Sequence, residues 1–152
     1  MSWLPEHFEH PERVELPTGH HLRPIRADDV DIDFPAVMGS RERLWAIYGE
    51  SWGWPPATMT LEQDREDLLH HEQEIAAQIT FNYAVLDEAE SELLGCVYID
   101  PPDERSPEGA DAAASWWVVD KEAGGELERA LDGFVPRWLS DTWGFSSVHF
   151  AP

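Results

Sequence analysis

Six segments of the chain have the apolar content and the length of β-strands. They are Val14–Leu16, His21–Arg26, Phe81–Leu86, Leu93–Ile99, Trp116–Asp120 and Ser147–Phe150. Pro-Thr-Gly after the first segment predicts a hairpin with the second, and the acidic turn Asp87–Glu92 joins the third to the fourth. We therefore expect hairpin-connected, antiparallel strands before the last third of the chain.

Helical spacing of apolar residues predicts helices before the central strands. The segment from Asp28 to Tyr48 is helical in outline, with interruptions at Pro35 and Gly39, and a Gly- and Pro-rich loop follows over residues 49–56. The next helix is the clearest, because Thr60 and Gln63 form a capping box at its start. Its apolar positions fall near one face at Leu61, Leu68, Ile75, Ala76 and Ile79.

The last third of the chain predicts a parallel strand pair. An amphipathic helix over Glu126–Leu139 separates the strands Trp116–Asp120 and Ser147–Phe150, and Pro136 is expected to kink it or split it after Gly133. A connection of this length is too long for a hairpin, so the two strands should lie parallel. The expected fold is α/β, with antiparallel strands, a parallel strand–helix–strand crossover and flanking helices.

Length and composition favour one domain over residues 1–152, with residues 1–19 as an N-terminal arm held by Trp3, Leu4 and Phe8. No apolar run approaches the ~20 residues that span a bilayer, and no basic leader begins the chain. Cys96 is the only cysteine, which agrees with a reducing compartment. We expect a cytoplasmic protein.

The net charge of −21 excludes nucleic acid and anionic membranes as partners, because both would be repelled. Lys121 is the only lysine among ten basic residues. A halophilic host explains an acidic, lysine-poor surface, and a genome that favours arginine codons explains only the shortage of lysine. The same charge opposes polyanionic ligands, so a site for one would need local positive potential.

The segment Leu22–Asp29 (LRPIRADD), the strand Trp116–Asp120 and the glycine turn that follows it resemble the GNAT acyltransferase superfamily, with the same order of elements over roughly residues 20–150. A short branch with a WPP loop, MTLE, GCVYI and VHFAP is the most similar. This resemblance implies acetyl-CoA as acyl donor and a small-molecule amine as acceptor. It assigns pantetheine to the backbone of Val118 and Val119, pyrophosphate to Lys121, Gly124 and Gly125, and the acceptor to the loop with Trp52 and Trp54.

Two features depart from the family pattern. The turn after Asp120 is about one residue shorter than usual, lacks its Gln or Arg and carries Glu122 and Glu126, and nothing after Pro152 corresponds to the family's last helix and strands with their catalytic Tyr. A strand-to-helix connection whose glutamates complement the helix dipole explains the turn better, because these anionic side chains occupy the space that a pyrophosphate would need. Three hypotheses therefore stay open: an N-acyltransferase, a non-catalytic ligand- or partner-binding domain, and a homodimer paired through the edge strand Ser147–Phe150.

Candidate catalytic groups lie on the predicted strands. His149 is a candidate base and Tyr98 a candidate acid, with Asp100 beside them, although packing in the core or at an edge explains each better, because strand residues mostly serve packing. Trp52 and Trp54 either form an acceptor wall or fill the core. Histidines recur as His7 with His10, His20 with His21 and His70 with His71, but their spacing is common and we expect no metal site.

Overall fold

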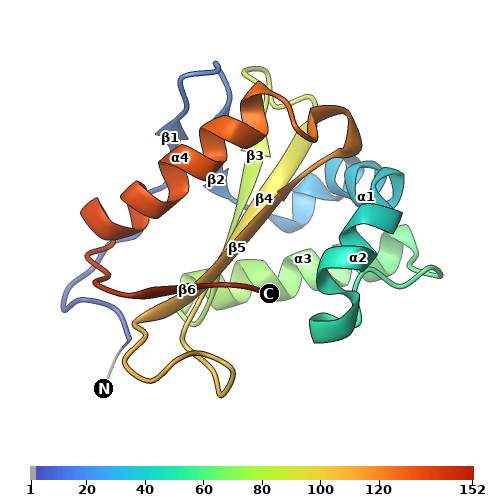
Figure 1. Cartoon of the computed structure of the whole chain (residues 1–152). Coiled ribbons are helices and arrows are strands. Elements are labelled where there is room, and N and C mark those ends of the chain that lie inside the picture. The colour runs from blue at the N-terminus through green and yellow to red at the C-terminus, as the bar shows by residue number, and fades with distance from the viewer. Residues whose placement is uncertain (1–2) are drawn as a thin grey trace.

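The computed structural model describes residues 3–152 and shows a mixed sheet covered by helices (Figure 1). In sheet order, the strands are β1 (Val14–Glu15), β2 (His21–Pro24), β3 (Phe81–Leu86), β4 (Leu93–Asp100), β5 (Ala112–Val118) and β6 (Val148–Phe150). All neighbours from β1 to β5 pair antiparallel, and β5 pairs with β6 in parallel. The predicted α/β fold, with its terminal parallel crossover, is confirmed.

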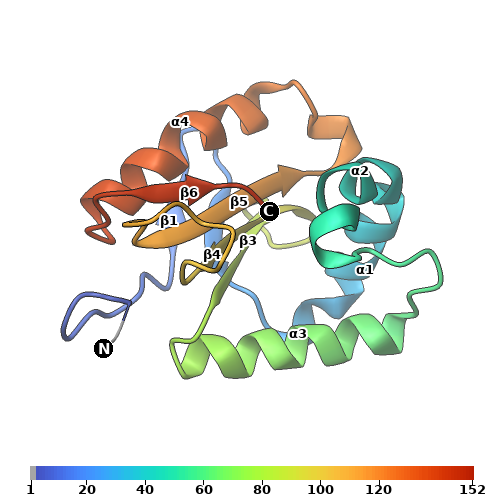
Figure 2. The same cartoon turned by 60° about the horizontal axis from the view of Figure 1, so that its bottom comes forward.

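The helices lie in layers above and below the sheet (Figure 2). They are α1 (Val30–Gly39), α2 (Arg41–Trp52), α3 (Leu61–Ala76) and α4 (Glu126–Asp141), with short 3-10 turns at Ala27–Asp29 and Asp120–Glu122. Helix α4 covers one face, and α1, α2 and α3 lie on the other (Figure 2). Within residues 3–152, none of the helices has the length and apolar content needed to cross a membrane.

The capping box predicted at the start of α3 is present. Thr60 Oγ1 accepts from the Gln63 N–H, and Gln63 Oε1 accepts from the Thr60 N–H, at 3.1 and 2.9 Å. The prediction for the other end is wrong, because α3 stops at Ala76 and Ile79 is 51% exposed beyond it. Gln78, at φ 58°, adopts a left-handed conformation that ends the helical path.

The interruption predicted at Gly39 is confirmed, because α1 ends there and α2 begins at Arg41. The break predicted at Pro35 and the split predicted after Gly133 are wrong, because α1 continues through Pro35 and α4 through Pro136. In each helix the proline removes a hydrogen bond to a carbonyl four residues earlier, and these carbonyls belong to exposed residues, Asp31 and Asp132, that water can reach. Helix α2 likewise extends through Gly49 to Trp52, so the following loop begins at Gly53.

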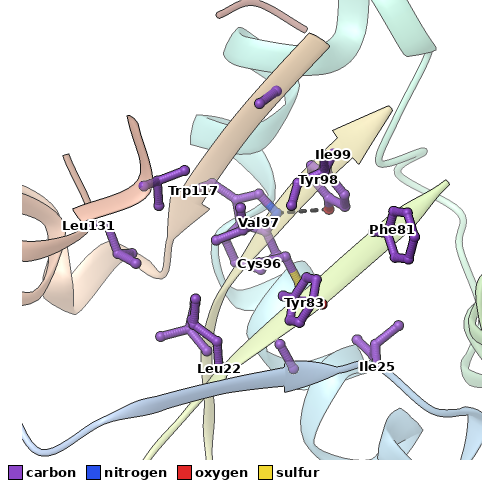
Figure 3. Close-up of a cluster of buried hydrophobic side chains, with 14 of the residues drawn as sticks. Leu22, Ile25, Phe81, Tyr83, Cys96, Val97, Tyr98, Ile99, Trp117 and Leu131 are labelled. Atoms are coloured by element: carbon purple, nitrogen blue, oxygen red, sulfur yellow. Dashed lines mark hydrogen bonds between the residues drawn. The ribbon is translucent and has the colours of Figure 1, made fainter. Parts of the chain in front are cut away.

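The core lies between β3, β4 and β5 and the helices that cover them (Figure 3). Trp117 on β5 is buried and donates its indole N–H to the Tyr98 hydroxyl on β4, at 2.8 Å. Gly95 allows these strands to approach, because a Cβ at that position would lie 2.1 Å from the Trp117 carbonyl oxygen. The close contact between β4 and β5 fixes the position of β5, the strand that pairs with β6.

The described part of the N-terminal arm packs against the body as expected. Trp3 stacks on Phe145 with ring centres 5.9 Å apart, Phe8 contacts Trp143, and Leu4 is buried. The Tyr83 hydroxyl donates to the Pro11 carbonyl at 2.6 Å. These contacts close the end of the sheet opposite the turn between β5 and α4.

Candidate functional site

Strands β5 and β6 pair over only three residues. The register runs from Ala112 opposite Val148 to Ala114 opposite Phe150, and the last bond is donated by the Ala151 N–H to the Ala114 carbonyl, at 3.1 Å. Strand β5 itself starts at Ala112 rather than at the predicted Trp116, so the pairing covers only its first half. Alternation along the strand directs the backbone polar groups of Trp116 and Val118 to the side where β6 no longer pairs.

The predicted pantetheine groups on β5 differ in their backbone contacts. The Val118 carbonyl lies on the open side and accepts from the Arg43 guanidinium at 2.9 Å. The Val119 N–H donates to the Leu94 carbonyl at 2.9 Å, so it belongs to the β4 side of the strand. Of the two residues, only Val118 has its backbone carbonyl on the side of β5 where β6 no longer pairs.

The glycine turn before α4 holds a carboxylate of its own. The Gly124 N–H donates to Glu128 Oε1 at 2.8 Å, and the Gly125 N–H donates to the Glu122 carbonyl at 3.0 Å. Gly125 is the N-cap of α4 and supplies no side chain, so the first N–H groups of the helix are left for water or a ligand. The backbone N–H groups of the turn are arranged as in an anion-binding site, and the Glu128 carboxylate competes with an anionic ligand for them.

Lys121 points away from these N–H groups. Its ammonium pairs with Glu92, on the turn between β3 and β4. Two arginines lie closer to the turn: Arg129 donates to the Gly124 carbonyl at 2.8 Å, and Arg43 from α2 lies 3.1 Å from Asp120 Oδ1 and 4.0 Å from Glu128 Oε2. Sequence reasoning missed Arg43, because 77 residues separate it from Asp120.

A pocket of about 460 Å³ opens on the face of the sheet covered by α1 and α3. Its lining combines carboxylates with tryptophans and comes from α1, the end of α2 and the loop after it, α3, and the ends of β3 and β4. The lining residues are Asp33, Trp52, Trp54, Asp64, Asp67, Leu68, His71, Glu74, Thr80, Phe81, Asn82, Tyr98, Asp100, Pro101 and Asp103. The structure thus brings Trp52 and Trp54 of the predicted acceptor loop to the same pocket as Tyr98 and Asp100.

Asp33 on α1 and Asp64 on α3 form a carboxyl pair at the base of this pocket. Both are 3% exposed, and their side chains hydrogen-bond to each other. Burial raises the pKa of both groups, and the neighbouring carboxylate raises that of Asp33 further. Asp64 Oδ2 and the nearby Asn82 Oδ1 are buried without a hydrogen-bond partner.

Asp100 lies at the end of β4, at the other end of the pocket. Burial, followed by repulsion from Glu74 and Asp103, raises its pKa to about 7. A carboxyl group with this pKa is half ionised near neutral pH and can accept a proton from an ammonium ion. Asp100 is therefore a stronger candidate base than the sequence indicated.

Tyr98 is held mainly by the core. Its hydroxyl accepts from the Trp117 indole N–H (Figure 3), and burial raises its pKa well above the usual value. The ring of Tyr98 lines the pocket and makes edge contacts with Trp52 and Trp54, with ring centres 5.1 and 6.5 Å apart. Tyr98 thus positions the two tryptophans of the pocket wall.

The predicted histidine sites lie apart from the pocket, except for His71. His149 on β6 is opposite Ala113, outside the pocket lining, and buried His21 pairs with Glu90 at 2.7 Å. His70 contacts Glu74 at 3.3 Å. Among the residues that the structure describes, no group of three or more His, Cys, Asp or Glu side chains is arranged to hold a metal ion.

No model of a known protein family matches the sequence, and no curated protein matches it significantly. Solved structures do match. A ribosomal-protein-S5-alanine acetyltransferase from Vibrio fischeri is 18% identical with a TM-score of 0.59, over 84% of this chain and 67% of that one. RimL, a ribosomal L7/L12 α-N-protein acetyltransferase solved with coenzyme A, is 15% identical with a TM-score of 0.64, over the same fractions.

An acetyltransferase from Salmonella typhimurium, which modifies the N-terminal serine of ribosomal protein L7/L12, is 13% identical with a TM-score of 0.60. The match covers 87% of this chain and 70% of that one. At these identities the likeness concerns the fold. The mixed sheet, the parallel crossover and the flanking helices are those of this group of enzymes.

Proposed function

We propose that this chain, whose fold is that of the GNAT acetyltransferases, is a cytoplasmic N-acyltransferase that transfers an acyl group from acetyl-CoA to an amine. The observation that carries the proposal is the register across β4, β5 and β6. Tyr98 and Asp100 line the pocket and are opposite Ser115 and Ala113. Those two residues flank Ala114, where β6 stops pairing with β5. The pocket and the opening of the sheet therefore meet at the same point.

The donor side of the proposed site fits acetyl-CoA, with one competitor. The uncapped start of α4 supplies N–H groups and a positive dipole for phosphate, and Arg43 and Arg129 add positive charge beside it. Glu128 opposes binding, because its carboxylate already accepts from Gly124. When bound, acetyl-CoA supplies a thioester whose acyl carbon is open to attack by an amine.

The acceptor side is built for an amine. An amine enters as an ammonium ion, and Asp100, with its pKa of about 7, accepts the proton that must leave before nitrogen can attack. Trp52 and Trp54 form an aromatic wall above Tyr98, which favours a cation and excludes water. These residues hold the acceptor and move its proton.

Release of free thiol from acetyl-CoA, measured with a panel of primary amines, tests the proposal. We expect amine-dependent thiol release by the parent protein and a loss of at least about 100-fold in Asp100→Asn. Glu62→Gln on the exposed first turn of α3 removes the same charge outside the pocket and should leave turnover unchanged. Amine binding without thiol release from any amine would favour a non-catalytic binding domain instead.

A further inference from the structure

We propose that the acceptor is an extended amine with at least two ammonium groups, bound lengthwise along α3. This inference rests on the proposed function, since it specifies the substrate class of the same pocket. Six carboxyl groups line the pocket, and none of the described lining residues is a lysine or arginine. Such a lining attracts cations and repels carboxylates and phosphates.

The carboxyl groups are distributed over the length of the pocket and not gathered at one point. Asp64, Asp67, His71 and Glu74 recur at helical spacing along one face of α3. Ten residues separate Asp64 from Glu74, which corresponds to about 15 Å of helix at 1.5 Å per residue. The pocket is thus long enough for a chain-like ligand that contacts both ends.

Each end of the pocket has its own carboxylate group. Asp33 and Asp64 hydrogen-bond to each other at one end. Asp100 lies near Glu74 and Asp103 at the other end, opposite Ala113 and next to the last paired residue of β5, Ala114. One end can hold a distant ammonium group while the other receives the amine that reacts.

Two buried acceptor atoms of the lining residues, one on α3 and one on β3, are available to the ammonium group that does not react. Asp64 and Asn82 are pocket-lining residues that are 3% exposed, and each has a buried oxygen, Oδ2 and Oδ1, without a hydrogen-bond partner. An unpaired buried acceptor is costly, and an ammonium ion brings three donors. A monoamine that reacts at Asp100 would leave these acceptors unpaired, whereas a diamine satisfies them.

Calorimetric titration without acetyl-CoA tests the inference, with diaminooctane (an amine at each end) compared with octylamine. We expect the diamine to bind at least about tenfold more tightly, since each charge-assisted hydrogen bond contributes roughly that factor or more. Asp64→Asn should weaken diamine binding by roughly 10- to 100-fold and leave octylamine binding unchanged. Exposed Asp67→Asn is the second variant should Asp64→Asn fail to fold, and Glu62→Gln is the matched charge control.

Equal binding of the two amines, or a diamine preference that survives both aspartate substitutions, would overturn the inference. The proposed function would still stand in that case if monoamines are acetylated. Conversely, tight diamine binding that depends on Asp64, with no acetyl transfer to any amine, would overturn the enzyme proposal and leave the pocket as a diamine-binding site.

Discussion

Glu128 Oε1 accepts a hydrogen bond from the backbone N–H of Gly124, 2.8 Å away, at the start of α4. In this position, at the positive end of the helix, the carboxylate takes the place that an anionic ligand would occupy. The backbone N–H of Gly124 in the short glycine turn therefore already has a hydrogen-bond acceptor within the chain.

Replacement of Glu128 by glutamine should strengthen CoA binding by roughly three- to tenfold. The substitution removes a negative charge whose interaction with the helix terminus, up to ~1–2 kcal/mol, competes with that of the ligand. Calorimetric titration of CoA at fixed moderate salt measures the change. Glu126→Gln removes the same charge from the same helical turn without a bond to Gly124 and should have a smaller effect. Equal gains in the two variants would show that only net charge matters.

Arg43 should contribute more to CoA binding than Lys121. Arg43 lies against the Val118 carbonyl, Asp120 and Glu128, whereas exposed Lys121 pairs with Glu92. We expect Arg43→Ala to weaken CoA binding by about tenfold and Lys121→Ala by less than about twofold. Thermal melts of both variants check that the fold is intact, and the reverse order of effects would contradict this assignment.

The rate of acyl transfer should rise with pH and level off above about 7, because Asp100 must be ionised to accept a proton and burial raises its pKa to about 7. The inflection in kcat/KM against pH measures it. The raised pKa means that the folded state binds this proton more tightly than the unfolded state. Stability contributed by Asp100 is therefore lost as pH rises from about 4 to 7.

Asp100→Asn removes this dependence on pH. At pH 8 it should be more stable than the parent by on the order of 1–2 kcal/mol, since Asp100 keeps partial contact with water, and the difference should vanish near pH 4. Urea unfolding at the two pH values gives the comparison. A stability difference independent of pH would mean that Asp100 is not held by burial among carboxylates.

Two glycines should respond in opposite directions to alanine. Gly95→Ala places a Cβ 2.1 Å from the Trp117 carbonyl, so β4 and β5 must separate, and we expect a loss of about 2–4 kcal/mol in the free energy of unfolding. Gly133 lies inside α4 with open space around it, so Gly133→Ala should add about 0.5–1 kcal/mol. Chemical unfolding of the two variants measures both changes. Similar changes in the free energy of unfolding would contradict the close contact between β4 and β5.

Thermal stability should increase with salt. The net charge is −21, and ~0.15 M salt screens charges beyond ~8 Å while ~1 M salt screens beyond ~3 Å. Melting midpoints in NaCl should therefore continue to rise between these concentrations. A midpoint that is flat or falls would show that repulsion between surface carboxylates does not limit stability.

Local pattern determined much of the fold. Alternation and apolar runs indicated all six strands, although β5 begins at Ala112, before the predicted Trp116. Thr60 and Gln63 predicted the start of α3, and the length of the last connection predicted that β5 and β6 are parallel. These features depend on neighbouring residues, so a single sequence contains them. Element ends were less certain, because the continuation of a helix through Pro35 or Pro136 depends on what covers each side of it.

The tertiary structure alone determined the chemistry of the site. Asp33 and Asp64 lie on different helices, and their shared hydrogen bond exists only because α1 and α3 pack together. Similarly, Asp100 has a pKa near 7 only because folding buries it beside Glu74 and Asp103. The sequence identifies which side chains can ionise, but desolvation and the proximity of other charges, which change their pKa, arise when distant segments come together.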